Sequence, residues 1–310
     1  MGRLWGAERC RLAGALIVAA GLVIGICGLA RDGLAYTAAG DRVFAATALL
    51  PQIAPGDEFY TWGWTVPLAG GPVGAPSRAT NVGVSYDKTI TERLAVGLGE
   101  SWFRLDRVGA GSWQGSQNVA TWIKYLLIND HAHEFALSLG VMREWGGTGA
   151  RRVGALRSGQ TAPRLYFGKG LGDLDIGYLR PLGVVGFAGY EFADSPPRPD
   201  LVTTGFGVQY SMPYLQSKVR SFDLPGLIRR LTPMTEVLFT TPAVRSFGAR
   251  TTVLIAPGVS YAGDGWEFLV EALVPATRAT AAGVGVRAQL YLSLDFLFPE
   301  TIGRPLFSGR

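Results

Sequence analysis

The chain has 310 residues, of which 48% are hydrophobic and 17% charged. This composition is too apolar for a disordered chain and leaves room for one large domain or two small ones. The 43 glycines and 11% aromatic residues, beside only four methionines and two histidines, favour a β-rich protein with many turns.

The N-terminal region has the order of segments that is typical of an export signal. Three arginines within the first eleven residues precede an uncharged run of nineteen residues, Leu12–Ala30. Small residues fit cleavage after Ala30 or Ala35, and we expect the second, so that residues 1–35 form a signal peptide. An uncleaved anchor is the alternative, because about 20 apolar residues span a bilayer.

Both cysteines, Cys10 and Cys27, lie inside this presequence. The mature chain is therefore expected to contain no disulfide, thiolate nucleophile or cysteine metal site. Four arginines and two acids leave with residues 1–35, so the formal charge falls from +5 to +3. No basic cluster is interleaved with aromatic residues, and we exclude nucleic acid as a partner.

The rest of the sequence has a hydrophobic period of two and no second run long enough for a transmembrane helix. Gly283–Phe296 is the clearest case, because every second residue from Val284 onward is apolar and the intervening residues are small or polar. A strand places these two sets on opposite faces. The same alternation recurs in Asn81–Asp87, Glu134–Met142, Thr203–Met212 and Trp266–Val274.

We predict an all-β protein with twelve strands, an even number that returns both ends of a transmembrane barrel to the periplasm. The strands are expected over residues 58–66, 80–88, 93–106, 116–128, 133–146, 160–168, 182–193, 200–212, 232–241, 250–261, 265–275 and 282–296.

The lengths of the connections give the barrel a direction. If the first strand runs outward, the short turns 88–92, 129–132 and 262–264 are periplasmic, as barrels of this kind prefer. The Gly/Pro-rich loops 67–79, 107–115 and 147–159 then face outward. Two long periplasmic connections, 169–181 and 213–231, break the rule, and the second is expected to hold a short helix.

The alternative to a membrane barrel is a soluble periplasmic β-sandwich or lipocalin-like barrel, whose water-facing side would be rich in charged residues and threonine. Here the polar face consists mostly of Gly, Ser, Ala and Gln, and the large residues form the other face. We therefore predict a transmembrane antiparallel β-barrel over residues 58–310 in the outer membrane of a Gram-negative bacterium. We place aromatic residues at its lipid interfaces, namely Tyr60, Trp62, Trp64, Trp102, Trp122, Trp145 and Trp266.

Residues 36–57 precede the first predicted strand. Asp41–Leu50 has an acidic start and apolar spacing, which predicts a short helix stopped by Pro51. We favour a periplasmic tether for this segment, with a plug inside the barrel as the alternative.

The sequence assembles no catalytic or metal site. His131 and His133, the only histidines, lie at a predicted periplasmic turn, away from the lipid-facing outer edge where a Ser–His lipase would need them. Gly168–Asp173 lacks the spacing of a phosphate-binding loop. We expect no enzymatic activity, no metal and no cofactor.

Ionisable side chains on the predicted inward face imply a wet lumen or an interior of ion pairs, because at membrane depth they must face water or a partner. Glu267 and Glu271 lie beside Arg287 of the next strand, which predicts an ion pair. Many inward glycines leave space and favour a narrow water-filled channel. The candidates that line a solute path are Lys124, Glu134, Glu144, Glu267, Glu271, Arg287 and Gln289.

One predicted external loop carries Arg151, Arg152 and Arg157. Guanidinium groups pair well with phosphates, so these residues are candidates for contact with lipopolysaccharide. A solvated loop without a partner is the alternative.

Several stretches resemble uncharacterised proteobacterial outer-membrane proteins that are grouped with the proposed transporters of meta-pathway phenol degradation. They are FYTWGWTVPL (59–68), RLYFGKGLGDL (164–174), YSMPYLQSKV (210–219) and LSLDFLFPETIGRPLF (292–307). The resemblance implies an outer-membrane barrel, inserted by the barrel-assembly machinery, that passes small aromatic or other hydrophobic compounds. It transfers no functional residue. The chain departs from the usual aromatic C-terminus of such barrels, because SGR follows Phe307.

Two functions from different classes fit these observations. The first is passive transport of small molecules through the barrel. The second is a closed structural or interaction barrel whose external loops bind lipopolysaccharide or a partner, and a lumen filled by side chains or by residues 36–57 would favour it.

Overall fold

The computed structural model describes residues 38–68, 77–107, 109, 111–196, 198–243 and 250–307. The signal peptide predicted for residues 1–35 lies outside these residues.

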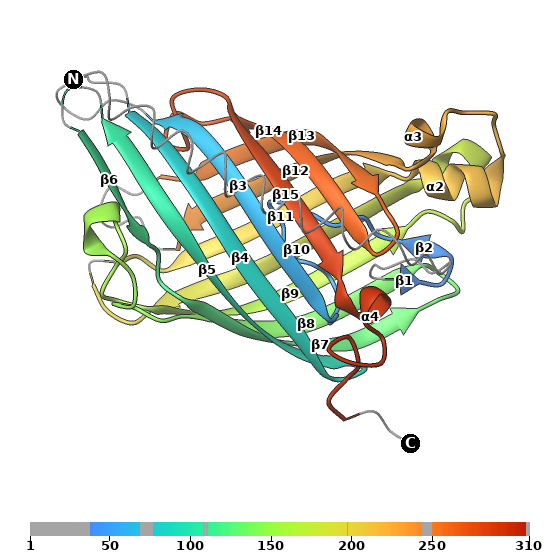
Figure 1. Cartoon of the computed structure of the whole chain (residues 1–310), viewed down its shortest axis with the longest axis horizontal. Coiled ribbons are helices and arrows are strands. Elements are labelled where there is room, and N and C mark those ends of the chain that lie inside the picture. The colour runs from blue at the N-terminus through green and yellow to red at the C-terminus, as the bar shows by residue number, and fades with distance from the viewer. Residues whose placement is uncertain are drawn as a thin grey trace.

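One antiparallel sheet closes into a barrel (Figure 1). Apart from β6 and β7, which both pair with β5, each strand pairs with its neighbours in the sequence, and the last strand pairs with the first, β15 with β3. The strands are β3 (Glu58–Leu68), β4 (Ser77–Thr91), β5 (Leu94–Arg107), β6 (Gly111–Ser116), β7 (Ala120–Asp130), β8 (Phe135–Glu144), β9 (Gln160–Gly170), β10 (Leu182–Ala193), β11 (Leu201–Tyr210), β12 (Leu231–Pro242), β13 (Thr252–Ala262), β14 (Trp266–Pro275) and β15 (Gly285–Ser293).

β6 and β7 pair one after the other with β5 and form a single wall strand interrupted at residues 117–119. The barrel therefore has twelve strands, as predicted. Residues 111–115, expected to belong to a loop, instead extend the hairpin with β5. The last strand ends at Ser293, three residues earlier than predicted, because Ser293 pairs with Glu58 and no residue of β3 lies beyond it.

Short helices lie at the ends of the barrel. They are η1 (Arg151–Val153), η2 (Gly177–Leu179), α2 (Met212–Tyr214), η3 (Leu215–Val219), α3 (Gly226–Arg229) and α4 (Leu294–Leu297). The connection 213–231 is thus helical in part, as expected. None of the helices among the described residues is long and apolar enough to cross a membrane.

Asp41–Leu50 is not helical. β1 (Ala38–Ala39) and β2 (Arg42–Val43) form a small hairpin, and the chain from Phe44 to Asp57 has no regular secondary structure. The prediction used apolar spacing alone, whereas here the peptide groups bond to side chains of the barrel wall rather than to their own helical turns.

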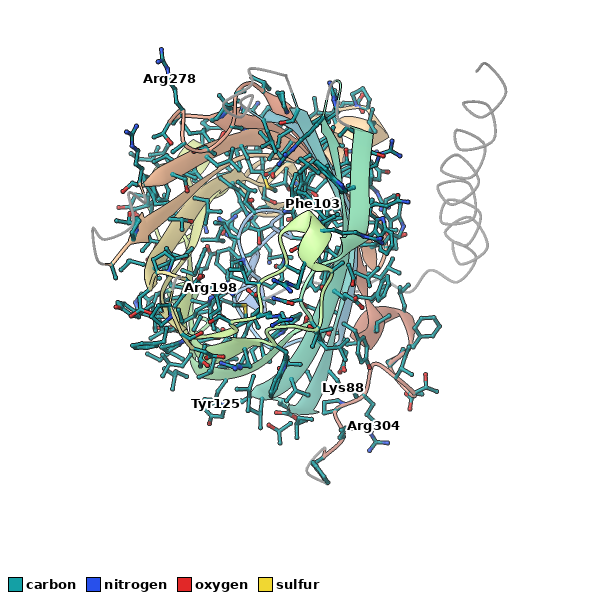
Figure 2. The ribbon with its side chains drawn as sticks, turned by 90° about the vertical axis from the view of Figure 1, so that its left-hand side faces the viewer. Lys88, Phe103, Tyr125, Arg198, Arg278 and Arg304 are labelled. Carbon is teal, nitrogen blue, oxygen red and sulfur yellow. The ribbon has the colours of Figure 1, made fainter. Side chains whose placement is uncertain are left out.

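The two faces of the wall differ as the alternation predicts. Val84, Leu139, Phe206 and Phe268 are exposed on the outside, and Figure 2 shows Tyr125 pointing away from the barrel. The neighbouring inward positions are buried and polar or small, as at Asn81, Ser85, Ser138, Gln209 and Gln289. Apolar residues this exposed, on a sheet without open edges, match a hydrocarbon environment, and the barrel is located in the outer membrane.

The interfacial aromatic residues were only partly predicted. Trp102 and Trp145 are exposed on the outside, and Trp266 packs against outward-facing Tyr261. Tyr60, Trp62, Trp64 and Trp122 instead face inward. The cause is strand parity, since Tyr60 and Trp62 alternate with outward Phe59, Thr61 and Gly63 on β3.

The barrel ends differ in their connections. Short turns join β4 to β5, β7 to β8 and β13 to β14 at the end where β3 begins and β15 finishes, on the right in Figure 1. We assign this end to the periplasm, because transmembrane barrels keep their short turns there.

Asp57 joins the start of the barrel to its neighbours. Its buried carboxylate accepts hydrogen bonds from Thr89 N (3.0 Å), from the Thr89 hydroxyl and from Lys88 Nζ. Its backbone oxygen accepts from Leu294 N at 2.8 Å. Residues from three regions of the sequence therefore meet at the seam where the last strand closes on the first.

Replacing Asp57 with Ala should weaken this seam. The change leaves the Thr89 N–H without its acceptor and removes one of the two acceptors of Lys88, a loss of about 1–3 kcal/mol in the free energy of unfolding. Urea unfolding in lipid vesicles and the temperature at which the barrel loses its heat-modifiable gel mobility measure the effect. Asp264→Ala, which removes an exposed ion pair with Arg230, is the control and should change little. Equal stability of the two variants would contradict the role of Asp57.

Candidate functional site

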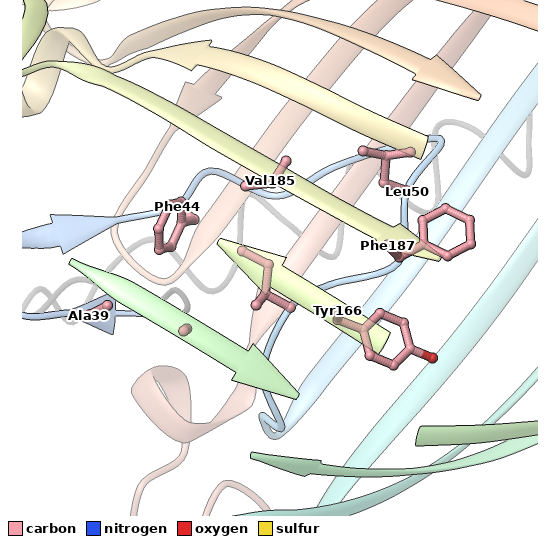
Figure 3. Close-up of a cluster of buried hydrophobic side chains, with 8 residues drawn as sticks. Ala39, Phe44, Leu50, Tyr166, Val185 and Phe187 are labelled. Atoms are coloured by element: carbon pink, nitrogen blue, oxygen red, sulfur yellow. The ribbon is translucent and has the colours of Figure 1, made fainter. Parts of the chain in front are cut away.

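The inside of the barrel holds a stretch of its own chain, residues 42–54, which we call the inner segment. Its apolar side chains are buried, and Phe44, Leu50 and Ile53 pack with Tyr166, Val185 and Phe187 of the wall in one cluster (Figure 3). Ala45 and Ala48 pack with Met234 and Leu269 on another side.

Glycines of the inward face make room for this segment. A Cβ at Gly168 would lie 2.5 Å from Ile53 Cδ1, and one at Gly205 would lie 2.5 Å from Leu50 Cδ2. The sequence predicted that water fills the space beside the inward glycines. In the structure the inner segment occupies part of that space.

Wall side chains hold the inner segment by its main chain. Glu267 Oε2 accepts from Ala46 N at 2.7 Å, and Glu236 Oε2 accepts from Leu49 N at 2.6 Å. An extended chain without a partner strand needs such acceptors, because buried peptide groups are nearly always paired. Three further wall residues bond to the main chain, namely Gln209 to both polar groups of Ala45, Gln289 to Thr47 O and Lys124 to Gln52 O.

Arg42 fixes the periplasmic end of the inner segment. Its guanidinium donates to the backbone oxygens of Pro181 (2.9 Å), Leu182 (3.0 Å) and Arg180, and it forms an ion pair with Glu134 at 3.3 Å.

Glu134 lies in the turn before β8 rather than along the lumen wall. Its carboxylate also accepts from Tyr214 Oη at 2.8 Å and from Gly172 N at 2.9 Å. Its φ of 49° is in the left-handed region, which a residue other than glycine adopts only when its surroundings hold it there. Burial, followed by the hydrogen bond to Glu134, raises the pKa of Tyr214.

A cavity of about 370 Å³ lies between the inner segment and the wall strands β3 to β9 and β15. Residues Thr47 to Gln52 line one side of it. Four rings, Tyr60, Trp62, Trp122 and Tyr166, and three cationic side chains, Lys124, Arg164 and Arg287, line the rest, together with Asp87 and Gln289.

The cationic side chains in the cavity contact aromatic rings, a carboxylate or an amide. Lys124 Nζ lies 5.0 Å from the centre of the Tyr166 ring, and Arg164 forms an ion pair with Glu191 at 3.1 Å. Arg287 lies over the Trp62 ring at 5.7 Å and donates to Gln289.

The predicted pair of Arg287 with a glutamate is not formed. Glu271 is opposite Arg287 in the strand register, but no N–O distance within 4.0 Å joins them, and both Glu271 oxygens lack a hydrogen-bond partner among the described residues. Register fixes the positions of the backbone, whereas the direction of each long side chain depends on the contents of the lumen.

Glu144 lies at the outer mouth. Both terminal nitrogens of Arg198 donate hydrogen bonds to its carboxylate, at 2.9 and 2.7 Å, and the Asn118 amide nitrogen donates a third at 2.8 Å. Asn118 also binds Gly149 N and Leu156 O, so the loop 145–159 is tied down at this end of the barrel. Figure 2 shows Arg198 within the ring of strands as seen from the mouth.

The three loop arginines lie at this mouth. Arg151, Arg152 and Arg157 are exposed, and Arg152 donates to Gln114 O at 2.6 Å. On the same rim, a hydrogen bond from Arg143 lowers the pKa of Asp194. Contact of these arginines with lipopolysaccharide stays a prediction.

Sequence reasoning missed Arg42, Arg198 and the inward rings. The period-two pattern placed Glu236 on the inward face but did not show its bond to Leu49 N. Arg42 and Arg198 carried no signal, because their partners are 92 and 54 residues away in the sequence. In the part of the chain that the structure describes, no three His, Cys, Asp or Glu residues gather in a way that could hold a metal ion.

Comparisons with known proteins bear on the fold. Neither the models of known protein families nor the curated proteins give a match. Among solved structures, an outer membrane channel from Pseudomonas putida F1 superposes with a TM-score of 0.52 at 10% identity, over 80% of this chain and 99% of that one. The fold is that of an outer-membrane barrel.

Two porin structures also match this outer-membrane barrel. They are the NanC porin, with a TM-score of 0.48 at 8% identity, and the KdgM porin, with 0.45 at 10% identity. Each alignment covers 76% of this chain and 98% of the porin.

Enlarging Gly168 should loosen the inner segment. In Gly168→Leu the new side chain overlaps Ile53 and Phe44, and such overpacking costs about 1–3 kcal/mol, or roughly 5- to 150-fold more open population. A cysteine at buried Ala48, in a mature chain expected to have no other, should react with a maleimide faster by that factor. Gly63→Leu, on the outward face, is the control, since its Cβ meets nothing within 3.8 Å. Equal labelling rates in both variants would contradict the packing role of Gly168.

Removing Arg198 should free the outer loop. In Arg198→Ala the Glu144 carboxylate loses a two-point, charge-assisted contact, and the tie between loops 145–159 and 194–200 weakens. Trypsin added to intact cells should then cut at Arg151, Arg152 or Arg157 faster than in the parent. Arg104→Ala, which breaks an ion pair within one strand, serves as the control. An unchanged cleavage rate would show that Arg198 does not secure the loop.

Proposed function

We propose that this outer-membrane barrel is a passive channel for small molecules and that the inner segment controls passage. The observation that carries the proposal is the cavity of about 370 Å³ within the barrel, bounded on one side by residues 47–52. Its size is in the range of pockets that hold small organic molecules. Only non-covalent contacts keep the inner segment in place among the described residues, so it can move without breaking the wall.

The lining of the cavity supports aromatic or other hydrophobic solutes. Tyr60, Trp62, Trp122 and Tyr166 offer ring surface, while Lys124, Gln289 and Arg287 offer a few polar contacts that can orient a solute. In this proposal the inner segment is held by hydrogen bonds from Lys124 and Gln289 and to Glu267. Arg287 contacts the solute, and Glu271 lies opposite Arg287 on the neighbouring strand. Glu134 secures the periplasmic end, and Glu144 secures the outer loop.

One observation favours the second candidate, a closed interaction barrel. The inner segment fills part of the lumen, and Arg151 and Arg157 are exposed on an external loop. In that case the loops would bind lipopolysaccharide phosphates and no solute would pass.

A reversible lock on the inner segment separates the two functions. Ala48 and Leu269 lie in one buried cluster, so a cysteine at each position can join the segment to the wall in a chain expected to have no other cysteine. In vesicles, the reduced protein should conduct ions and admit benzenesulfonate, an aromatic anion that does not cross the bilayer unaided, and oxidation should abolish both. Each single-cysteine variant is a control and should not respond to oxidation.

The same measurements can contradict the proposed channel. Absence of conductance and uptake in the reduced protein and in Gly168→Leu would support the closed barrel. Conductance that persists after complete cross-linking would contradict control by the inner segment. Faster uptake of benzenesulfonate than of an aliphatic sulfonate of similar size would support the aromatic solute class.

A further inference from the structure

The chain leaves the barrel wall after β15 and continues on its outside. α4 turns it away from the sheet, with Phe298 N bonded to Leu294 O at 2.7 Å. We call residues 298–307 the C-terminal apron. Figure 2 shows the apron outside the ring of strands, with Arg304 next to Lys88.

The apron covers an edge of the sheet that β3 leaves open. The pairing of β3 with β4 stops at Glu58 and Asp87, but β4 continues to Thr91. Leu306 N donates to Thr89 O at 3.1 Å and Phe307 N donates to Ile90 O at 2.8 Å, while Lys88 Nζ donates to Arg304 O at 2.7 Å. An open edge with unsatisfied peptide groups is thereby paired, which fixes the apron against the wall.

The apron presents apolar side chains outward rather than toward the barrel. Phe298, Ile302, Leu306 and Phe307 are 39%, 49%, 60% and 71% exposed. Four large apolar side chains exposed within ten residues are unusual for a surface that meets only water. They are continuous with the lipid-facing wall, because Ile90, whose backbone binds Phe307, follows outward-facing Tyr86 and exposed Val84 on β4.

The position and charge of the apron indicate which surface it contacts. It lies at the end of the barrel where β15 finishes (Figure 1) and outside the ring of strands (Figure 2). Arg304 of the apron and Arg93 of the turn between β4 and β5 are exposed, beside the exposed acids Glu300 and Glu92, while Lys88 is paired with Asp57. Apolar side chains together with cations form the pattern that binds the boundary between acyl chains and phosphate headgroups.

We propose that the C-terminal apron is an interfacial anchor that binds phospholipids of the periplasmic leaflet. Phe298, Ile302, Leu306 and Phe307 contact the upper part of the acyl chains, and Arg304 lies at the level of the phosphates. This binding surface does not depend on whether the barrel conducts solutes.

The test places a fluorescent probe on the apron of the whole barrel in phospholipid vesicles. Phe307→Cys carries an environment-sensitive dye, and the lipids carry a nitroxide quencher just below the headgroup. Tyr125→Cys, on the lipid-facing wall, is the positive control. Leu156→Cys, 46% exposed on the outer loop, is the control in water. Heat-modifiable mobility verifies that each variant is folded, and Ile302→Cys provides a second apron site.

We expect a blue-shifted emission at Phe307 and Ile302, a loss of emission to the lipid quencher comparable to that at Tyr125, and protection from aqueous iodide. Quenching by iodide as at Leu156 would overturn the proposal, because the apron would then lie in water. Protection from both quenchers would also overturn it and would indicate a protein contact, such as a second copy of the chain.

Discussion

Each peptide group that enters a bilayer must find a hydrogen-bond partner within the protein, because the hydrocarbon offers none. β15 meets this requirement by pairing with β3, which removes the free edges of the sheet. Closure then forces successive side chains alternately into lipid and lumen. Where β4 outruns β3, the same requirement draws the C-terminal apron onto the exposed edge.

Peptide groups inside the lumen also need hydrogen-bond partners. From Phe44 onward the inner segment has no strand to pair with, so Glu236, Glu267 and Gln209 receive and donate its main-chain hydrogen bonds. These hydrogen bonds go to the backbone of the segment and not to its side chains. They hold the extended chain in place and can break without any change in the wall. The glycines beside Phe44 and Leu50 leave the space that the segment needs inside the barrel.

The sequence predicted the wall well and the contents of the lumen poorly. The inward positions of Lys124, Glu267 and Gln289 follow from period-two alternation and were found, but their role in gripping residues 46–52 was not visible. The helix expected at Asp41–Leu50 failed for a related reason. Its apolar spacing serves packing against several wall strands at once, and propensity is a weak guide when tertiary contacts decide.

The sequence by itself determined the number of strands and the face of most wall residues outside the aromatic positions of β3 and β7. These features depend on local periodicity and composition, which the order of residues contains directly. Only the tertiary structure decided what fills the barrel, which ends Glu134 and Glu144 secure, and where the chain goes after Ser293. Each of these depends on contacts between residues far apart in the sequence, and such contacts exist only once the sheet has closed.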